Sequence, residues 1–265
     1  MSRDTDKTTK NVAIVFGGHS PIAIHCAISL ARSQQVFIVT RKIDDALVGE
    51  IGSSPAITPL EADLAQVGAA GSVVEGIYQR GLEPTALAFI QRYRPSGKPS
   101  FEEHSQVELW SIAEALEAVG RLKAPSTSVN VVLTSSPAAY KFLNDQDVTY
   151  HVVKAGQEAV SRFYAVKLRQ TGVSINTVRI GSLVVKPRAQ KYWDSIAPVL
   201  KGLGALSPAG KVPSSGEVGE SLAQVISPSM NGLTGQILTL DGGYSMLDGA
   251  QLAKAALEME LNNEI

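Results

Sequence analysis

Residues 11–23 read Asn-Val-Ala-Ile-Val-Phe-Gly-Gly-His-Ser-Pro-Ile-Ala and place a continuous apolar run directly before a pair of glycines. A short run that is apolar at every position predicts a strand buried on both faces, as in a parallel sheet. After the glycines, Ser20 suits the cap and Pro21 the first position of a helix. A strand, a tight turn and a helix in this order present helix N–H groups at the turn, where dinucleotide-binding folds hold a pyrophosphate. The stretch also fits an ordinary tight turn, because Pro21 and Ala23 stand where a glycine fingerprint has its later glycines. The candidate cofactor contacts here are Gly17, Gly18, Ser20, Pro21 and Ile22.

The alternation of buried strands and helical segments continues along the chain. Further strands are expected at residues 35–40, 56–59, 86–90, 128–134, 174–180 and 236–240. Helices are expected at residues 21–32, 64–80, 101–122, 149–170 and 215–226. Alternating strands and helices imply parallel crossovers. The predicted fold class is therefore α/β, a single-domain Rossmann-type doubly wound parallel sheet in a three-layer α/β/α arrangement.

The domain organisation follows from this pattern and from composition. Residues 1–10 are polar and predict a flexible tail, and residues 11–265 predict one dinucleotide-binding domain. Residues 181–211 show no clear pattern and are expected to form a substrate loop, because long ordered loops are often functional. Residues 250–265 are rich in Ala, Leu and Glu and predict a C-terminal helical extension.

Composition excludes several function classes. Of the 265 residues, 44% are hydrophobic and 18% charged, which is typical of a soluble globular domain. The net charge of −1 gives no argument for a nucleic acid or an anionic membrane as partner. The single cysteine, Cys26, predicts a reducing, cytoplasmic location, and residues 1–10 lack the apolar core of a signal peptide. No apolar run is long enough to span a bilayer.

The end of the second strand indicates which cofactor is preferred. An acidic residue at that position would hydrogen-bond the ribose hydroxyls of NAD, but the chain has Thr40 followed by Arg41 and Lys42. A cation and the absence of a carboxylate favour a 2′-phosphate, so NADP(H) is favoured over NAD(H). The alternative is that Arg41 and Lys42 form a solvated strand end. Asp63 and Leu64, after the third strand, either contact an adenine or begin the next helix, with Asp63 as its cap.

Tyr150 and Lys154 are four residues apart in a predicted helix, so both side chains lie on one face. A neighbouring cation favours the phenolate and lowers the pKa of a tyrosine toward the range in which it exchanges a proton with a carbonyl oxygen. The spacing alone is also common among ordinary surface residues of helices.

In order and spacing, these features resemble those of the short-chain dehydrogenase/reductase family, from residue 11 to about residue 244. The resemblance is carried by the Gly17-Gly18 turn, Ser135-Ser136, Tyr150 with Lys154, and Gly235-Gln236 followed by Asp241-Gly242-Gly243. It implies a single Rossmann-type domain that packs as a homodimer or homotetramer through the fourth and fifth helices. It also implies a small-molecule carbonyl substrate.

The resemblance assigns roles to individual residues. Tyr150 is implied to be the proton donor during carbonyl reduction, or the base in the reverse reaction. Lys154 is implied to lower the pKa of Tyr150 and to hold the nicotinamide ribose. Ser136 is implied to orient the substrate oxygen; it lies one residue farther from Tyr150 than is usual in the family, and Ser135 is the alternative.

The chain departs from the family pattern at three places. Phe89-Ile90-Gln91-Arg92 replaces Asn-Asn-Ala-Gly, and Ile180-Gly181 replaces Pro-Gly, with Gln91 and Gly181 as the implied cofactor contacts. Glu108 replaces an Asn that helps hold a water in the family's proton relay. A glutamate still accepts hydrogen bonds, but it can also pair with Lys154 and weaken the effect of that lysine on Tyr150.

The substrate is expected beyond the carboxyl ends of the strands, and an acidic group on it would suit the basic residues there. Arg92 and Arg94 are candidates to bind a phosphate or carboxylate. The candidate walls are Pro137, Tyr140, Phe142, Val184, Lys186, Arg188, Lys191, Tyr192 and Trp193, although a solvated lid face explains these cations equally well. The histidines lack metal-ligand spacing, so no metal is predicted and packing or surface roles are expected for His19, His25, His104 and His151.

Three functions are compatible with these residues. The first is NADPH-dependent reduction of a ketone or aldehyde. The second is an enoyl-type reductase, a branch that usually spaces its Tyr and Lys more widely. The third is an NADP(H)-binding protein with a sensor or structural role, for which Glu108 and the altered glycine turn argue.

Overall fold

In the computed structural model, which describes residues 11–52, 54–95, 100–181, 184–186, 190–230 and 232–261, parallel strands form one sheet. Its seven strands have the order β3-β2-β1-β4-β5-β6-β7. They are β1 (Val12–Phe16), β2 (Gln35–Thr40), β3 (Ile57–Glu61), β4 (Pro84–Phe89), β5 (Val129–Ser135), β6 (Val173–Ile180) and β7 (Ile237–Leu240). Every neighbouring pair is parallel. The predicted fold class is confirmed, and the strand order reverses between β1 and β4, where such sheets bind ligands.

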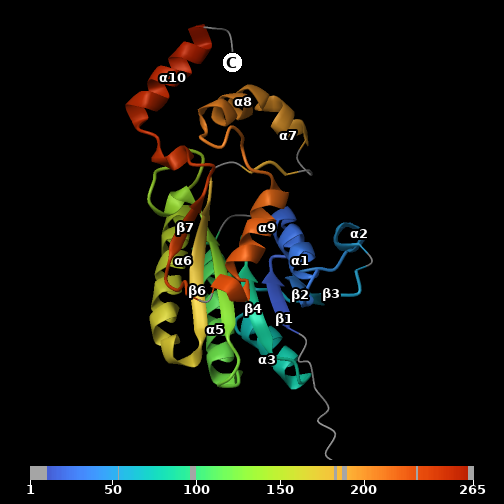
Figure 1. The fold of residues 1–265 in the computed structure, drawn as a ribbon. Coiled ribbons are helices and arrows are strands. Elements are labelled where there is room, and N and C mark those ends of the chain that lie inside the picture. Colours follow the sequence, from blue (N-terminus) through green and yellow to red (C-terminus); the bar gives the residue numbers. More distant parts are fainter. Residues whose placement is uncertain are drawn as a thin grey trace, which may run out of the picture.

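Helices cover both faces of the sheet (Figure 1). One face carries α3 (Ala69–Gln79), α5 (Ser111–Leu122) and α6 (Val148–Lys167), and the other carries α1 (Pro21–Leu30) and α9 (Ser215–Val225). Along β1, Val12, Ile14 and Phe16 pack on the first face while Ala13 and Val15 pack on the second. The continuous apolar run is thus buried on both faces, as predicted.

Strand bounds lie within two residues of those expected, whereas helix starts differ more. The helix expected from residue 64 begins at Ala69, because Gly68 caps it with a φ of +84°. The long helix expected at residues 101–122 consists of α4 (Phe101–Ser105), a π-helical turn η1 (Gln106–Trp110) and α5. Instead of running to residue 170, α6 passes into a 3₁₀ turn, Arg169–Thr171, that ends at Gly172 with a φ of +74°.

Three further helices lie in segments for which no helix was predicted: α2 (Asp45–Ile51), α7 (Gln190–Ser195) and α8 (Ala197–Leu206). The last two occupy much of the expected substrate loop. Together with α10 (Gly249–Leu261), they lie beyond the carboxyl ends of the strands (Figure 1). The predicted tail at residues 1–10 lies outside the described residues.

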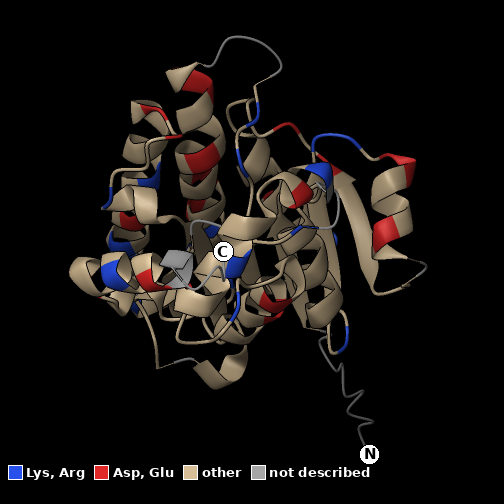
Figure 2. Ribbon diagram, turned by 90° about the horizontal axis from the view of Figure 1, so that it is seen from above, with Lys and Arg blue, Asp and Glu red and all other residues tan. Residues whose placement is uncertain are grey.

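Charged residues are distributed around the molecule. Viewed from above, basic and acidic positions are interspersed over the ribbon, in keeping with the net charge of −1 (Figure 2). Within the described ranges, every helix is too short or too polar to cross a bilayer.

Candidate cofactor and active site

The turn after β1 must be built from glycines, because the neighbouring strands leave no space for a side chain. Gly17 has a φ of +101°, and the N–H groups of Gly17 and Gly18 donate to Val39 O at 3.0 and 2.8 Å. A Cβ atom on Gly17 would lie 2.6 Å from the backbone nitrogen of Gln91, and one on Gly18 would lie 3.0 Å from Cβ of Thr40. The chain therefore leaves β1 in direct contact with β4 and β2, at the switch point of the sheet.

The N-terminus of α1 presents backbone donors next to this turn. Pro21 occupies the first turn and Ser20 the N-cap, but the Ser20 side chain makes no capping hydrogen bond. The N–H group of Ile22 lies in the first turn, where no intrahelical acceptor exists. A cavity of about 690 Å³ is lined by Gly17, Gly18, Ser20, Pro21 and Ile22. Unpaired helix N–H groups at a glycine turn suit the pyrophosphate of a dinucleotide.

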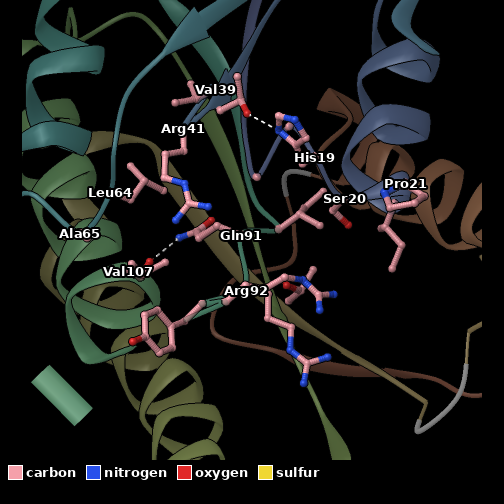
Figure 3. Close-up of a pocket in the computed structure, with 18 of the residues that line it drawn as sticks. His19, Ser20, Pro21, Val39, Arg41, Leu64, Ala65, Gln91, Arg92 and Val107 are labelled. Atoms are coloured by element: carbon pink, nitrogen blue, oxygen red, sulfur yellow. Dashed lines mark hydrogen bonds between the residues drawn. The ribbon is translucent and has the colours of Figure 1, made fainter. Parts of the chain in front are cut away.

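The end of β2 contributes cations to the same cavity. Thr40, Arg41 and Lys42 line it, and Arg41 turns its guanidinium inward toward Gln91 (Figure 3). Asp44 also lines the cavity, 3.0 Å from Nε2 of His19, whose Nδ1 lies 2.6 Å from Oγ1 of Thr40. The hydrogen bond from His19, and then that from the Leu47 N–H group, lower the pKa of Asp44. Arg41 forms no ion pair with any of the described residues.

Asp63, Leu64 and Gln91 line the next part of the cavity. Oδ1 of Asp63 accepts from Ala65 N at 3.1 Å and does not cap α3, so the capping alternative is wrong. Gln91 is buried, and its Nε2 donates to Val107 O at 3.3 Å (Figure 3). Its Oε1 is buried and has no hydrogen-bond partner among the described residues.

Tyr150 and Lys154 lie one helical turn apart near the start of α6, and both line the cavity. Asp147 caps this helix by accepting from Tyr150 N at 2.8 Å. Lys154 is only 4% exposed, and its Nζ lies 5.5 Å from the centre of the Tyr150 ring. The shared face predicted from the spacing is confirmed.

Of the two serines after β5, Ser136 is better placed to bind a substrate. Both line the cavity. Oγ of Ser135 donates to Glu158 Oε1 at 3.1 Å and contacts Lys154 O at 3.3 Å, so its hydrogen is engaged. Within the described residues, Oγ of Ser136 makes a single hydrogen bond, which it accepts from Ala138 N at 3.3 Å. Its hydroxyl hydrogen remains available to a ligand.

Glu108 lies behind Lys154 and is fully buried. Its Oε2 accepts from Lys154 Nζ at 2.6 Å, which confirms the pairing predicted from the sequence. Its Oε1 accepts from Tyr93 N at 2.7 Å and lies 3.1 Å from Nε2 of His104. Lys154 also donates to Gln157 Oε1 at 2.9 Å. The π-helical turn that contains Glu108 is a geometry often found at functional sites.

The charge state of Glu108 depends on these contacts. Burial alone would raise the pKa of this carboxyl group, but the charge of Lys154 and the hydrogen bonds from His104 and Lys154 lower it to about 2. Glu108 is therefore ionised, and the positive charge of Lys154 is shared between Glu108 and the face of Tyr150.

Three further cations line the cavity, and one of them, Arg92, lies close to Tyr150. Cζ of Arg92 lies 4.9 Å from the centre of the Tyr150 ring, and its Nη2 donates to Gln146 Oε1 at 3.2 Å. Arg94 and Lys186 line the same cavity. Burial and then Arg92 lower the pKa of Arg94, and burial, Arg94 and Arg92 lower that of Lys186.

The structure thus brings the predicted cofactor and catalytic residues together around one cavity, apart from Glu108, which lies behind its wall. Those that line it are Gly17, Gly18, Ser20, Pro21, Ile22, Thr40, Arg41, Asp63, Leu64, Gln91, Ser136, Tyr150, Lys154 and Gly181.

Most of the expected substrate walls lie elsewhere. Val184 and Lys186 line the cavity, whereas Tyr140 packs over Arg179, with its ring centre 4.3 Å from Cζ, and Phe142 is 81% exposed. The remaining walls also lie outside the cavity lining: Pro137 is buried, Lys191 and Tyr192 are exposed, and the Trp193 indole donates to Lys186 O at 2.6 Å. Arg188 lies outside the described residues.

Two histidines have roles that the sequence analysis missed. His19 contacts Thr40 and Asp44 at the end of the cavity formed by β1 and β2. Its position directly after the glycine pair could have indicated that it lies at this site. His104 is buried against Glu108, and their spacing of four residues in a helical segment was a signal for this pair.

Comparison with known proteins agrees with this geometry. A family described as enoyl-(acyl carrier protein) reductase matches residues 19–245. The chain is a short-chain dehydrogenase/reductase. Among curated proteins it is similar to a D-erythrulose reductase from Gallus gallus, with 24% identity over 88% of this chain and 94% of the relative. The family is one of oxidoreductases, and the low identity makes this chain a divergent member.

Solved structures share the fold of this short-chain dehydrogenase/reductase. A 3-oxoacyl-[acyl-carrier protein] reductase from Brucella melitensis in complex with NAD is 20% identical, with a TM-score of 0.76 over 90% of this chain and 98% of the other. A variant of ElxO with NADPH bound is 18% identical, with a TM-score of 0.77 over 90% of this chain and 100% of the other. Structural neighbours thus include proteins with either nicotinamide cofactor bound.

Proposed function

We propose that this chain is an NADP(H)-dependent oxidoreductase that reduces a ketone or aldehyde, or oxidises the corresponding alcohol. The observation that carries the proposal is that Ser136, Tyr150 and Lys154 line one cavity with the glycine turn and the N-terminus of α1. The donors that suit a pyrophosphate and the groups that suit a reacting carbonyl are therefore open to the same space.

The cofactor and the residues that line the cavity have separate roles in the proposed reaction. When bound, the nicotinamide supplies or accepts the hydride. Tyr150 gives its phenolic proton to the substrate oxygen during reduction, and Ser136 donates a hydrogen bond to that oxygen. Two donors that converge on one oxygen stabilise the negative charge that develops there. Lys154 stabilises the phenolate form of Tyr150, and Glu108 holds Lys154 in place.

The preference for NADP(H) is inferred from the end of β2. Arg41 points into the cavity (Figure 3), and Asp44, which also lines it, is bonded to His19. A 2′-phosphate would meet the Arg41 guanidinium and the Lys42 ammonium at the place where an NAD-specific protein carries an acid.

Assembly as a homodimer or homotetramer forms part of the proposal. Large apolar side chains are exposed on η1 and α6, among them Trp110, Val152, Phe163 and Val166. Exposed apolar patches on helices commonly mark contacts between subunits. We also expect a cytoplasmic location, because Cys26 is buried and has no disulfide partner.

One observation favours a second function. The 2.6 Å ion pair between Lys154 and Glu108 draws the lysine charge away from Tyr150, which would suit an NADP(H)-binding protein with a sensor or structural role and little turnover.

A titration of the purified protein with NADPH and with NADH, followed by nicotinamide fluorescence, tests the cofactor proposal. We expect tighter binding of NADPH, followed by NADPH-dependent turnover of some carbonyl compounds that the Tyr150→Phe variant lacks. Tighter binding of NADH would refute the preference inferred from Arg41. Binding without turnover across a broad carbonyl screen would favour the sensor function, and binding of neither cofactor would refute both functions.

A further inference from the structure

The cations that line the cavity outnumber the carboxylates that line it. The described residues that line the cavity include six lysines and arginines: Arg41, Lys42, Arg92, Arg94, Lys154 and Lys186. They include three carboxylates: Asp44, Asp63 and Glu103. This excess of positive charge occurs in a chain whose net charge is −1, so it is a local property of the cavity.

None of the three carboxylates forms an ion pair with the other cations near Tyr150, which are Arg92, Arg94 and Lys186. Asp44 is bonded to His19 at the β2 end, and Asp63 accepts from Ala65 N in its own turn. Glu103 accepts from the Tyr93 hydroxyl at 2.8 Å. In the part of the chain that the structure describes, no ion pair joins an acid to Arg92, Arg94 or Lys186.

These three cations come from two separate segments that meet at the cavity. Arg92 and Arg94 follow β4, whereas Lys186 follows β6. Lys186 is half-buried, and the pKa values of Lys186 and Arg94 are lowered by partial burial and by like charge. The ionised Glu108, which is paired with Lys154, partly offsets the effect on Arg94. Like charges that converge without an ion-pair partner of their own are still unfavourable in the free protein, and an anion placed among them relieves the repulsion.

The location of the group identifies which ligand it would serve. Cζ of Arg92 lies 4.9 Å from the centre of the Tyr150 ring, so the group borders the place where the carbonyl reacts. The donors suited to the pyrophosphate, and Arg41 for a 2′-phosphate, lie at the β1 and β2 end of the cavity. We propose that Arg94 and Lys186, together with Arg92, bind an anionic group of the substrate, so that the preferred substrate is a keto acid or keto phosphate with its anion close to the carbonyl. This inference rests on the proposed reductase function and specifies its substrate class.

Matched pairs of probes test the inference. Acetoacetate is compared with its methyl ester, and dihydroxyacetone phosphate with dihydroxyacetone, with NADPH as reductant. The variant is Arg94→Gln combined with Lys186→Gln, which spares Arg92 because of its contact with Tyr150. Lys201→Gln, an exposed lysine on α8, is the control for loss of one positive charge.

We expect the charged member of at least one pair to have the higher kcat/KM. Loss of two charge-assisted hydrogen bonds should lower that value about 10²- to 10⁴-fold in the double variant and change the value for the neutral member by less than about threefold. Lys201→Gln should behave as the unchanged protein. A preference for acetoacetate alone would identify the anionic group of the substrate as a carboxylate. A preference for dihydroxyacetone phosphate alone would identify it as a phosphate.

Equal rates for charged and neutral probes would overturn the inference. So would a double variant that binds NADPH more weakly but keeps the ratio of the two rates, because the cations would then serve the cofactor. If no probe is turned over, calorimetric titration of acetoacetate and dihydroxyacetone phosphate into the complex with NADP⁺ decides. Binding that the double variant loses would support the anion site and, without turnover, would favour the sensor function over the reductase function. Absence of binding would refute the site.

Discussion

The two ends of the cavity hold their charges in different ways. At the end formed by β1 and β2, backbone geometry fixes the site: Gly17 and Gly18 donate to Val39 O, and the cations Arg41 and Lys42 are exposed. At the end formed by α6, the cation itself is part of the interior. Lys154 is 4% exposed and its partner Glu108 is fully buried.

This difference determines what a substitution can change. An exposed cation on a strand end interacts with its ligand through solvent and can be exchanged with little effect on folding. A buried cation stays charged only with its partner in place, because an unpaired charge in the interior is costly. Cofactor preference at the β2 end should therefore vary independently of stability, whereas activity and stability should be coupled at the α6 end.

The largest expected effect is on turnover. Tyr150→Phe removes the proton donor and leaves the ring, so kcat should fall about 10²- to 10⁴-fold, the usual contribution of a positioned acid or base. The affinity for NADPH should change little, because the glycine turn and α1 are untouched. Steady-state rates and a fluorescence titration measure the two quantities. Comparable rates for both proteins would remove Tyr150 from the mechanism.

The next effect concerns the buried ion pair. Glu108→Gln leaves Lys154 without a negative partner, and the free energy of unfolding should fall by about 3–5 kcal/mol. Glu117→Gln is the matched control, because Glu117 pairs with Lys167 on the surface at side-chain exposures of 45% and 44%. Its loss should be about 0–1 kcal/mol. Urea unfolding compares them, and similar losses in both variants would contradict the contrast between the two ends of the cavity.

Acid should weaken the same ion pair. The pKa of Glu108 is lowered from 4.5 to about 2, so the unfolded chain binds this proton at a higher pH than the folded chain does. The stabilisation is therefore fully present above about pH 4.5 and is lost as the pH falls toward 2. Measured against pH, the stability difference between the unchanged protein and Glu108→Gln should shrink across this window. A constant difference would show that Glu108 does not titrate there.

A smaller effect is expected at the glycine turn. Gly17→Ala requires an alanine at a φ of +101° with its Cβ 2.6 Å from Gln91 N. A strained backbone of this kind costs about 1–3 kcal/mol, and the displaced turn should also weaken NADPH binding. Gly76→Ala in α3, where nothing lies within 4 Å of the added atom, should instead stabilise by about 0.5–1 kcal/mol. Thermal unfolding of the two variants should shift in opposite directions.

The fold could be predicted largely from the sequence because β1 is a continuous apolar run and the other strands are short, mostly apolar segments that alternate with helical ones. Helices α2, α7 and α8 were missed, being short or lying in a segment without a clear pattern. The π-helical turn around Glu108 also escaped prediction, since it differs from an α-helix by one residue per turn and leaves no mark in hydrophobic spacing.

Within the site, contacts that depend on one helix or one turn were predicted, and contacts across the sheet were harder. The shared face of Tyr150 and Lys154 follows from their spacing alone. The approach of Arg92 to the Tyr150 ring depends on Gln146, which is distant in sequence, and on a turn after β4 that no local pattern describes. The hydrogen bonds of His19 likewise required the position of α2, which supplies Asp44 at its cap.

The smallest expected effect tests the exposed end of the cavity. Arg41→Ala removes one partially solvated cation, so the Kd for NADPH should rise about tenfold, at the lower limit for a hydrogen bond to a charged group. The Kd for NADH should stay the same, and the midpoint of urea unfolding should not move, since the side chain is exposed. Raising the salt concentration should reduce the difference between the two cofactors in the unchanged protein, because salt screens exposed charges. Equal losses for NADPH and NADH would place Arg41 at the pyrophosphate or adenine and leave Lys42 as the remaining candidate for the 2′-phosphate. A loss of stability as large as that of Glu108→Gln would instead show that both ends of the cavity depend on charge for folding.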